Sequence, residues 1–414
     1  MAEGIDWRIS LTASERYDNI QKLTTAAAAA GLNQSAYSIE NGAYKTASSR
    51  EEYDAACDLP TAAAEPGRSL SPGDPTAPET DGQDSSPGIP IGSYQDCRYI
   101  ASGVTAEVYR AQTRALKVIV ETHNIEPHNP HLEVKILNSL RSTNAPNIIT
   151  LLETFRDRDQ RLVLVFPYMP FTLSHLLDNT PNQPLPTPLI RTIFTALFRA
   201  LHHLHSTGII HRDIKPSAIL LPSKSPTPSQ TPQIHLSDFG TAWHPTLSPA
   251  AANNESPTHK VLDIGTGPYR APETLFGDRA YGPAVDLWAA GATLAECFLG
   301  GRPLFESRAA HEDGNQLGLV LSIFQTLGTP TKETWPEAVG FRTPPFEMYR
   351  VFEGREGGWA GILPGLGSSS GGGEEGWREL VAGLVRYESG ERVKAGKVLE
   401  LPCMKGEIGG GDEA

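Results

Sequence analysis

Four charged side chains stand in short motifs whose residue types and spacing suit chemistry on a phosphate group. Asp213 and Lys215 lie two residues apart in the segment His-Arg-Asp-Ile-Lys that begins at His211. Asp238 follows in a Ser-Asp-Phe-Gly segment, and Lys117 ends an upstream Ala-Leu-Lys segment. A carboxylate can orient a hydroxyl or hold Mg²⁺, and a lysine can neutralise phosphate charge. This set therefore fits phosphoryl transfer, which needs positioning and charge neutralisation more than covalent help.

The order of these segments along the chain is characteristic of one protein family. Together with an Ala-Pro-Glu segment that ends at Glu273, they resemble the motif series of eukaryotic protein kinases. The resemblance implies a Ser/Thr kinase that uses ATP and Mg²⁺. In such a kinase Asp213 orients the substrate hydroxyl, Lys215 offsets charge on the transferring phosphate, and Asp238 holds the metal. Three motifs in this order argue against coincidental loops in another fold.

The resemblance also implies which residues bind the nucleotide. Lys117 would contact the α- and β-phosphates, and Glu133 would hold the lysine side chain in place. A solvated helix charge is the alternative for Glu133. Phe166 would be the gatekeeper, followed by a hinge at residues 167–169 whose backbone meets the adenine. The predicted nucleotide contacts are Ile100, Gly103, Val108, Ala115, Lys117, Glu133 and Met169.

Segments in the second half of the chain narrow the resemblance to the cyclin-dependent-kinase-like branch. They are residues 269–273 (YRAPE), 284–289 (AVDLWA) and 323–330 (IFQTLGTP), and the similarity spans roughly residues 95–402. Arg392 matches the arginine that pairs with the glutamate of the Ala-Pro-Glu segment in this family. Such a buried pair would be structural rather than catalytic.

The loop expected to cover the phosphates departs from the family pattern. The usual Gly-x-Gly-x-x-Gly is here Ala101-Ser-Gly103-Val-Thr-Ala106, so the middle glycine alone remains. Alanine is small enough for close backbone approach, but it costs free energy wherever a positive φ is required. We expect a stiffer loop and weaker ATP binding.

Ala218 is the more serious departure. The family places an asparagine there, which ligates a second Mg²⁺ and braces Asp213, and alanine cannot coordinate a metal. Two alternatives follow: the hydroxyl of Ser217 takes over, or the chain is a pseudokinase, a low-activity kinase-shaped scaffold. Because both aspartates and both lysines are present, we favour an active enzyme.

Two further departures concern regulation. Leu132 replaces the arginine expected just before the helix glutamate, and the usual activating threonine would fall near Val261, which cannot be phosphorylated. Arg212 would therefore lack its usual phosphate partner. We expect a kinase that needs neither a cyclin nor phosphorylation of its activation loop. Single-subunit fungal kinases that activate cyclin-dependent kinases resemble this chain in these departures, which implies another kinase as protein substrate and a role in cell-cycle or transcription control.

The chain divides by composition into three zones. Residues 1–58 are helix-prone, residues 59–92 are rich in Pro, Ser, Gly and acids and are predicted to form a flexible linker, and residues 93–405 hold the main core. The predicted fold is α+β: a bilobal kinase with a β-rich N-lobe (about 93–169), a helical C-lobe (about 170–405) and a helical N-terminal extension.

The N-terminal extension resembles parts of the small helical KIX domain of transcriptional coactivators. Residues 12–15 (TASE) form a capping-box pattern for a helix that ends near Gly31, and a second helix is predicted at residues 33–57. The resemblance implies a transcription-factor contact through residues 1–58. A plain helical extension or a poorly ordered N-terminus is the alternative.

Hydrophobic periodicity predicts the elements that position the motifs. Apolar positions predict strands and helices, and two Pro- or Gly-rich runs predict surface loops. The predicted strands are 99–111, 114–120 and 161–166, the helices 189–205 and 284–299, and the loops 222–232 and 364–376.

Composition excludes several classes of protein. The net charge of −13 argues against broad nucleic-acid binding, and no run of about 18 apolar residues is present to span a membrane. The four cysteines are far apart and form no C-x-x-C pair, which argues against a disulfide framework or zinc site. A reducing compartment, nuclear or cytoplasmic, fits best.

Overall fold

The chain forms two compact units in the computed structural model. The first comprises residues 1–123 and 153–165, and the second comprises residues 124–152 and 166–414. Among the residues that the structure describes, no helix is long and apolar enough to cross a bilayer. The described residues are Glu15, Asn19, Lys22, Leu23, Glu40, Ala43, Tyr44, Ala47, 49–58, 88–103, 105–120, 126–250, 254–307, 316–347, 351–366 and 373–405.

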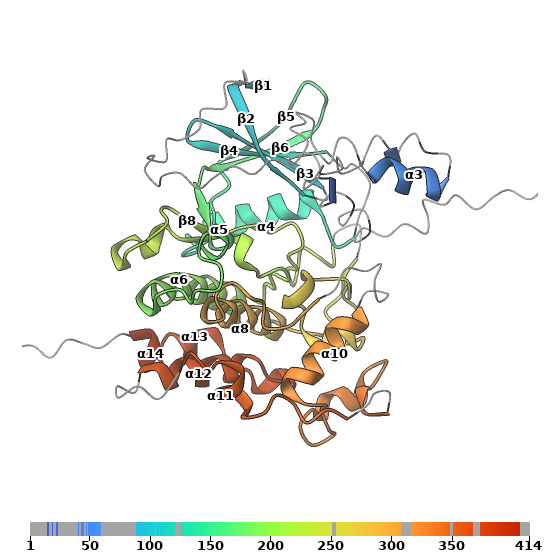
Figure 1. The fold of residues 1–414 in the computed structure, drawn as a ribbon. Coiled ribbons are helices and arrows are strands. Elements are labelled where there is room, and N and C mark those ends of the chain that lie inside the picture. Colours follow the sequence, from blue (N-terminus) through green and yellow to red (C-terminus); the bar gives the residue numbers. More distant parts are fainter. Residues whose placement is uncertain are drawn as a thin grey trace, which may run out of the picture. The chain divides into compact units, whose positions relative to one another are not determined.

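A six-stranded sheet is the main element of the first unit (Figure 1). Its strand order is β1-β2-β3-β4-β6-β5, and neighbours β1 to β4 pair in antiparallel hairpin fashion. The predicted strand 99–111 is wrong as one strand, because the N–H of Gly103 bonds the carbonyl of Ala106 at 2.8 Å and closes a turn. The strands are β1 Ile89–Ile91, β2 Tyr94–Ser102, β3 Ala106–Ala111, β4 Arg114–Ile119, β5 Glu153–Arg156 and β6 Leu162–Pro167.

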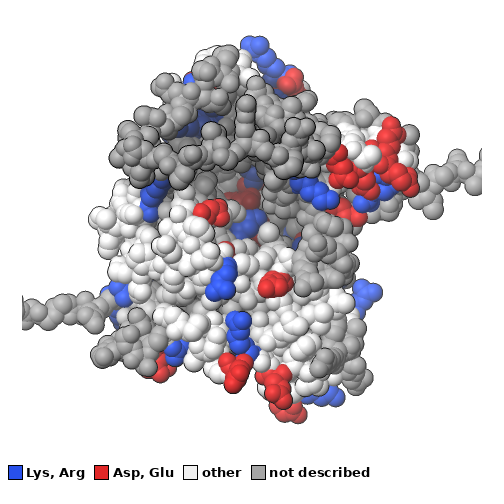
Figure 2. Space-filling model, viewed as in Figure 1, with Lys and Arg blue, Asp and Glu red and all other residues white. Residues whose placement is uncertain are grey.

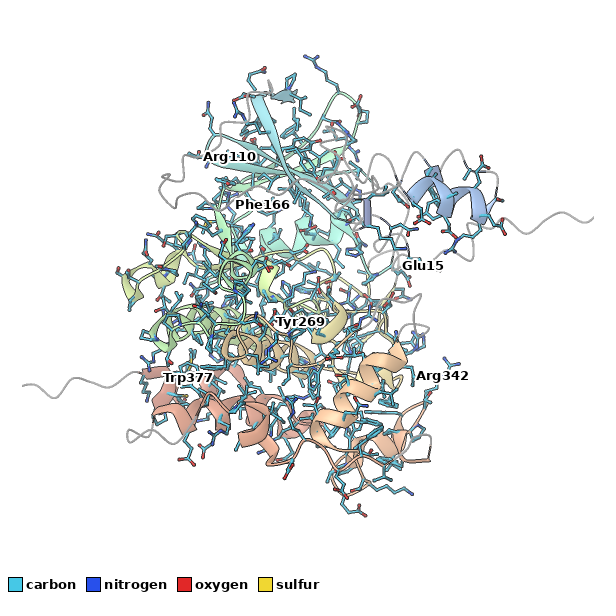
Figure 3. All side chains as sticks on the ribbon, in the orientation of Figure 1. Glu15, Arg110, Phe166, Tyr269, Arg342 and Trp377 are labelled. Atoms are coloured by element: carbon cyan, nitrogen blue, oxygen red, sulfur yellow. The ribbon has the colours of Figure 1, made fainter. Side chains whose placement is uncertain are left out.

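Alternating burial along the central strands gives the sheet its inner face. Leu116 and Val118 of β4 are fully buried, while Lys117 between them is half-buried. In β6 the run Val163–Val165 is fully buried, which confirms the strand predicted from a continuous apolar stretch. Phe166, labelled in Figure 3, stands near the end of this strand.

The N-terminal zone contains a small cluster around helix α3 (Arg50–Cys57). Ser49 caps this helix by accepting the N–H of Glu52, and Tyr53 is fully buried and donates to Glu40 at 2.7 Å. The end of the predicted helix 33–57 is thus a helix. Figure 2 shows acidic side chains gathered over α3. Apart from Glu15, the capping-box pattern lies outside the described residues, as does most of the KIX-like stretch.

The linker prediction also lies largely outside the described residues. Its last residues, however, form β1, which pairs with β2 through Ile89 and Cys97. The boundary between the linker and the folded domain therefore lies before Ile89, earlier than composition suggested. The short Ile-Pro-Ile run can form an edge strand because proline, which donates no hydrogen bond, is tolerated there.

The second unit is helical, and helix α8 is at its centre. All but its first residue are buried, as expected for a helix that is apolar on every side. A Cβ on Gly291 would lie 2.7 Å from Leu384 and Val385, so glycine allows α8 to pack closely against the end of α12. The helices are α4 Pro130–Ser142, α5 Leu173–Asn179, α6 Thr187–Ser206, α7 Pro272–Leu275, α8 Ala284–Phe298, α10 Gln316–Leu327, α11 Gly358–Ile362, α12 Gly373–Leu384, α13 Ala395–Val398 and α14 Pro402–Lys405.

The predicted helices of this unit are confirmed as α6 and α8, and each of the two predicted loops contains helical residues. Within residues 222–232, a 3-10 helix begins at Pro228, and the buried amide of Asn147 donates to the carbonyls of Thr231 and Ile234 at 2.7 and 2.9 Å. The end of the run 364–376 is helical, because α12 begins at Gly373. A small sheet completes the unit, with strands β7 Phe171–Thr172, β8 Ile219–Leu221 and β9 His235–Leu236.

Candidate active site

The catalytic loop, residues 211–218, is held by one buried carboxylate of α8. Asp286 accepts the backbone N–H groups of His211 and Arg212 at 2.9 and 2.8 Å, and the ring Nε2 of His205 at 2.9 Å. Burial alone would raise the pKa of Asp286, but the hydrogen bonds from His205 and the His211 N–H keep this pKa below its ordinary value. A charged carboxylate therefore fixes the start of the loop.

The loop also contains a strained residue. Arg212 has a φ of +71°, a conformation that non-glycine residues adopt only where the surroundings enforce it. The bond from its N–H to Asp286 supplies part of that constraint. The strain lies directly before Asp213, so it sets the direction in which the next side chain leaves the backbone.

Asp213 and Lys215 meet in the second unit, together with a threonine that the sequence motifs did not single out. Lys215 Nζ donates to Asp213 Oδ2 at 2.6 Å and to the hydroxyl of Thr266 at 3.0 Å. Thr266 in turn donates to Asp213 Oδ1 at 2.7 Å. Both carboxylate oxygens are thus engaged, while the Lys215 side chain keeps 21% exposure. This arrangement can orient a hydroxyl and neutralise charge at the same place.

One feature of the sequence could have identified Thr266 as a site residue. It is a hydroxyl residue five positions before Ala271, where the Ala-Pro-Glu segment begins. The preceding residue, Gly265, has a φ of +75°, and its carbonyl accepts Arg270 Nε at 3.0 Å. The left-handed glycine turns the chain so that Thr266 reaches the catalytic loop.

Asp238, the predicted metal ligand, lies in a segment tied to helix α4. Its φ is +65°, a second left-handed non-glycine residue in the site. The N–H of Asn129 donates to the carbonyl of Gly240 at 2.9 Å, and a Cβ on Gly240 would lie 3.5 Å from Glu133 Oε2. The chain thus brings Asp238 and the 2% exposed Glu133 into one neighbourhood.

The ring of His211 connects the catalytic loop to the same segment. Its Nε2 donates to the carbonyl of Ser237 at 2.9 Å, and its Nδ1 accepts the N–H of Asp213 at 3.3 Å. These two bonds assign the neutral tautomer with its proton on Nε2. The buried Phe239 packs edge-on against this ring with centroids 4.8 Å apart. One imidazole therefore links the backbone of Asp213 to the residues on both sides of Asp238.

The donor set fits one Mg²⁺ ion. Mg²⁺ takes one or two protein carboxylates and completes its shell with phosphate and water, which Asp238 allows. Ala218 is 1% exposed and offers no side-chain oxygen, and its carbonyl accepts both the N–H and the hydroxyl of Ser237. Ser217 is exposed, whereas Ala218 is buried, so the two side chains lie in different environments. Within the described ranges no three His, Cys, Asp or Glu side chains are grouped to hold a metal by themselves.

Three of the predicted nucleotide residues of the first unit share a face of the sheet. Val108 stands directly opposite Lys117, and Ala115 lies two residues from Lys117 on the same side of β4. Ile100 is 43% exposed at a register shift in β2. Among the described residues, a Cβ on Gly103 would meet only the Ala106 carbonyl at 3.9 Å, so none of them crowds this glycine. Met169, in the second unit, is half-buried.

The two alanines of the phosphate loop, Ala101 and Ala106, adopt backbone conformations without strain. Ala101 and Ala106 lie in β2 and β3, and neither is among the described residues with a positive φ. The penalty expected for alanine in a left-handed conformation therefore does not arise at these positions.

Comparisons with known proteins agree with this geometry. Residues 94–404 match the protein kinase domain family. The chain is 32% identical over 301 residues to the serine/threonine-protein kinase csk1 of Schizosaccharomyces pombe, covering 71% of this chain and 89% of that protein. It is 30% identical over 280 residues to the serine/threonine-protein kinase CAK1 of Saccharomyces cerevisiae, covering 58% and 75%.

A solved structure gives the same result. The chain resembles the structure of the CAK complex from Chaetomium thermophilum bound to ATP-γ-S, with a TM-score of 0.58 and 26% identity over 75% of this chain and 90% of that one. The fold and the family resemblance predicted from the sequence are thereby confirmed, including the likeness to fungal kinases.

Proposed function

We propose that this chain, which belongs to the protein kinase family and is a Ser/Thr kinase, phosphorylates the activation segments of cyclin-dependent kinases. The observation that carries the proposal is the cluster of Asp213, Lys215 and Thr266. It combines a carboxylate that can receive a proton with a lysine that can neutralise phosphate charge.

The residues have distinct roles in the reaction. The substrate hydroxyl forms a bond to the γ-phosphorus of ATP, the bond to the β-phosphate oxygen breaks, and ADP leaves. Asp213 orients the hydroxyl and receives its proton, and Lys215 stabilises charge on the transferring group. Lys117 contacts the α- and β-phosphates. Bound Mg²⁺ supplies further charge neutralisation, and Asp238 would hold it.

The choice of substrate rests on the likeness to fungal kinases of this branch. The chain matches most of the length of csk1 and CAK1. Its residue at position 261 is a valine, which has no hydroxyl to phosphorylate. We infer that it acts at the start of a phosphorylation sequence, without prior phosphorylation of its own activation segment by another kinase. Its substrate is then the activation segment of a second kinase.

Transfer to a defined substrate tests this function. Purified full chain with Mg-ATP is expected to phosphorylate a cyclin-dependent kinase at its activation-segment threonine. No product is expected with a substrate in which that threonine is alanine, or with the Asp213→Asn variant. If the wild-type chain transfers no more phosphate than Asp213→Asn, the proposal fails. Equal labelling of the alanine substrate would retain the kinase and remove the proposed site.

The pseudokinase alternative has little support in the site. Asp213, Lys215 and Asp238 are all present, and none of the relatives compared is described as inactive. Ala218, Ala101 and Ala106 motivate this alternative; the two loop alanines have no positive φ, and the effect of Ala218 is open to direct measurement.

A further inference from the structure

The anionic partner of Arg212 in this structure is a carboxylate. Its Nη1 and Nη2 donate to Glu255 Oε1 and Oε2 at 2.7 and 3.1 Å, a bidentate pair. The Arg212 side chain is fully buried, and that of Glu255 is 6% exposed. Glu255 lies in the activation segment, residues 238–273, and stands 43 residues from Arg212 in the sequence.

The guanidinium of Arg212 joins three parts of the site. It donates through Nε to the carbonyl of Thr241, directly after Gly240, and through Nη1 to the hydroxyl of Tyr281 at 3.2 Å. Its backbone leads into Asp213. A shift of this side chain would therefore change the positions of the catalytic loop and of the segment that contains Asp238.

Glu255 also holds two other points of the activation segment. Its Oε1 accepts the N–H of Val261 at 2.8 Å, and its backbone carbonyl accepts the indole N–H of Trp243 at 3.0 Å. The carbonyl of Val261 accepts the hydroxyl of Tyr281 at 2.7 Å. Five residues after Val261 the chain reaches Thr266, which bonds Asp213.

The pair is too deeply buried to be a surface contact. Removing one partner would leave an uncompensated charge inside the protein, which is far more costly than breaking an exposed ion pair. Phosphorylation orders activation loops in kinases by giving arginine an anion to bind. Here the carboxylate of Glu255 already binds the Arg212 guanidinium, and Val261 cannot be phosphorylated.

We propose that Glu255 is a positioning residue whose carboxylate holds the activation segment and the catalytic loop in their working arrangement without phosphorylation. The proposal rests on the proposed kinase function, and it assigns to an unmodified side chain the role that a phosphate has in loop-activated kinases. Glu255 acts through Arg212 and touches neither substrate nor nucleotide.

Kinetics of the full chain test the role. After treatment with a Ser/Thr phosphatase, the wild type is expected to keep its kcat within about twofold. Glu255→Gln keeps the shape but loses the charge, and it is expected to lower kcat at least tenfold, roughly the cost of small misplacements near a reacting centre. The KM for the protein substrate should rise while the KM for ATP stays within about twofold. Glu255→Asp should recover part of the loss.

A merely structural role predicts a different pattern. Partial unfolding would lower the apparent kcat and leave both KM values unchanged, and the folded fraction from circular dichroism would account for the loss. Asp263→Asn is the matched control, since Asp263 is an acid in the same segment that pairs with Arg270 rather than Arg212. Wild-type kinetics in Glu255→Gln, or loss of wild-type activity after phosphatase treatment, would overturn the proposal.

Hydrogen exchange separates this proposal from the kinase function. In the inactive Asp213→Asn background, Glu255→Gln is expected to speed exchange of the Val261 amide at least about tenfold, because that N–H loses a charged acceptor. Unchanged exchange would overturn the role of Glu255. A wild-type chain that phosphorylates no substrate would instead overturn the proposed function, and the exchange result would still decide the role of Glu255.

Discussion

Glu273 and Arg392, which are 119 residues apart in the sequence, form a bidentate ion pair that solvent does not reach. Nη1 and Nη2 donate to the two carboxylate oxygens at 2.6 and 2.8 Å. Arg392 also donates to the carbonyls of Ala284, Arg386 and Tyr387, and its guanidinium lies 5.1 Å from the ring centroid of Trp288. The pair ties the end of the activation segment to α8 and to the chain after α12. The family resemblance implied the pairing itself but not these further links.

Removing one partner of this pair should be far more costly than removing both. Glu273→Gln leaves Arg392 buried without a counter-charge, so we expect the free energy of unfolding to fall by about 3–5 kcal/mol. The double variant Glu273→Leu with Arg392→Met should lose less than either single change. Urea denaturation measures these differences.

An exposed ion pair provides the control for this prediction. Glu391 lies 3.7 Å from Arg386, with both side chains more than half exposed. Glu391→Gln should therefore change the free energy of unfolding by less than about 1 kcal/mol. A loss below about 1 kcal/mol in Glu273→Gln as well would contradict the structural role of the buried pair.

The sequence predicted the parts of the site that lie within short motifs. Asp213 and Lys215 are two residues apart, and a spacing of that kind fixes which side chains lie near each other. Thr266 and Glu255 were missed because they meet Asp213 and Arg212 across 53 and 43 residues of irregular chain. No periodicity marks the register of such a segment, so composition alone could not place those two side chains.

For the fold, too, regular local patterns were predicted correctly and irregular segments were not. Helices α6 and α8 have long apolar patterns and were predicted to within two residues. The strand predicted at residues 99–111 was wrong because its turn contains a small, strand-compatible segment around Gly103, closed by one backbone hydrogen bond. The beginning of α12 at Gly373 was hidden for a related reason, since a Gly-rich run has low intrinsic helix propensity.

The hydroxyl of Thr266 should matter for turnover more than for nucleotide binding. Thr266→Val removes the donor to Asp213 Oδ1 and leaves the volume nearly unchanged. Because Asp213 then loses part of its orientation, we expect kcat to fall by about 10²-fold, with a KM for ATP that stays within about twofold. Steady-state kinetics at saturating protein substrate measure both.

Two substitutions serve as controls for the threonine. Thr266→Ser keeps the hydroxyl and should retain most of the activity. Thr274→Val removes a buried hydroxyl that bonds only the carbonyl of Ala271, so it should lower stability and leave kcat nearly unchanged. Equal turnover of Thr266→Val and Thr266→Ser would show that the hydroxyl bond to Asp213 has no catalytic weight.

Restoring the family asparagine at Ala218 should have little effect on the rate. Asp213 is already held on both oxygens by Lys215 and Thr266, so bracing by an asparagine is not needed. We expect Ala218→Asn to change kcat by less than about threefold, which corresponds to well under 1 kcal/mol in activation free energy. Ala218→Leu has a similar size without a metal ligand and reports the effect of volume alone. A large gain from near-zero wild-type activity would instead favour the pseudokinase reading.

One buried acid, Glu296, should contribute stability that is lost as the pH rises. Burial and the nearby Asp178 raise the pKa of Glu296 to about 7, although a hydrogen bond from Tyr269 (labelled in Figure 3) at 2.7 Å lowers it in part. Since the ordinary glutamate pKa is near 4.3, the folded chain binds more protons than the unfolded chain between these two values. The contribution of Glu296 to stability is therefore lost as the pH rises through this window and is absent above it.

Two variants of this pair test the direction of the pH effect. Relative to Glu296→Gln, the wild type should lose about 2–3 kcal/mol in free energy of unfolding between pH 5 and pH 8, measured by urea denaturation at each pH. Tyr269→Phe removes the hydrogen bond that favours the charged form, so its decline should move to higher pH. A difference between wild type and Glu296→Gln that stays constant, or grows in favour of the wild type with rising pH, would show that Glu296 is charged throughout.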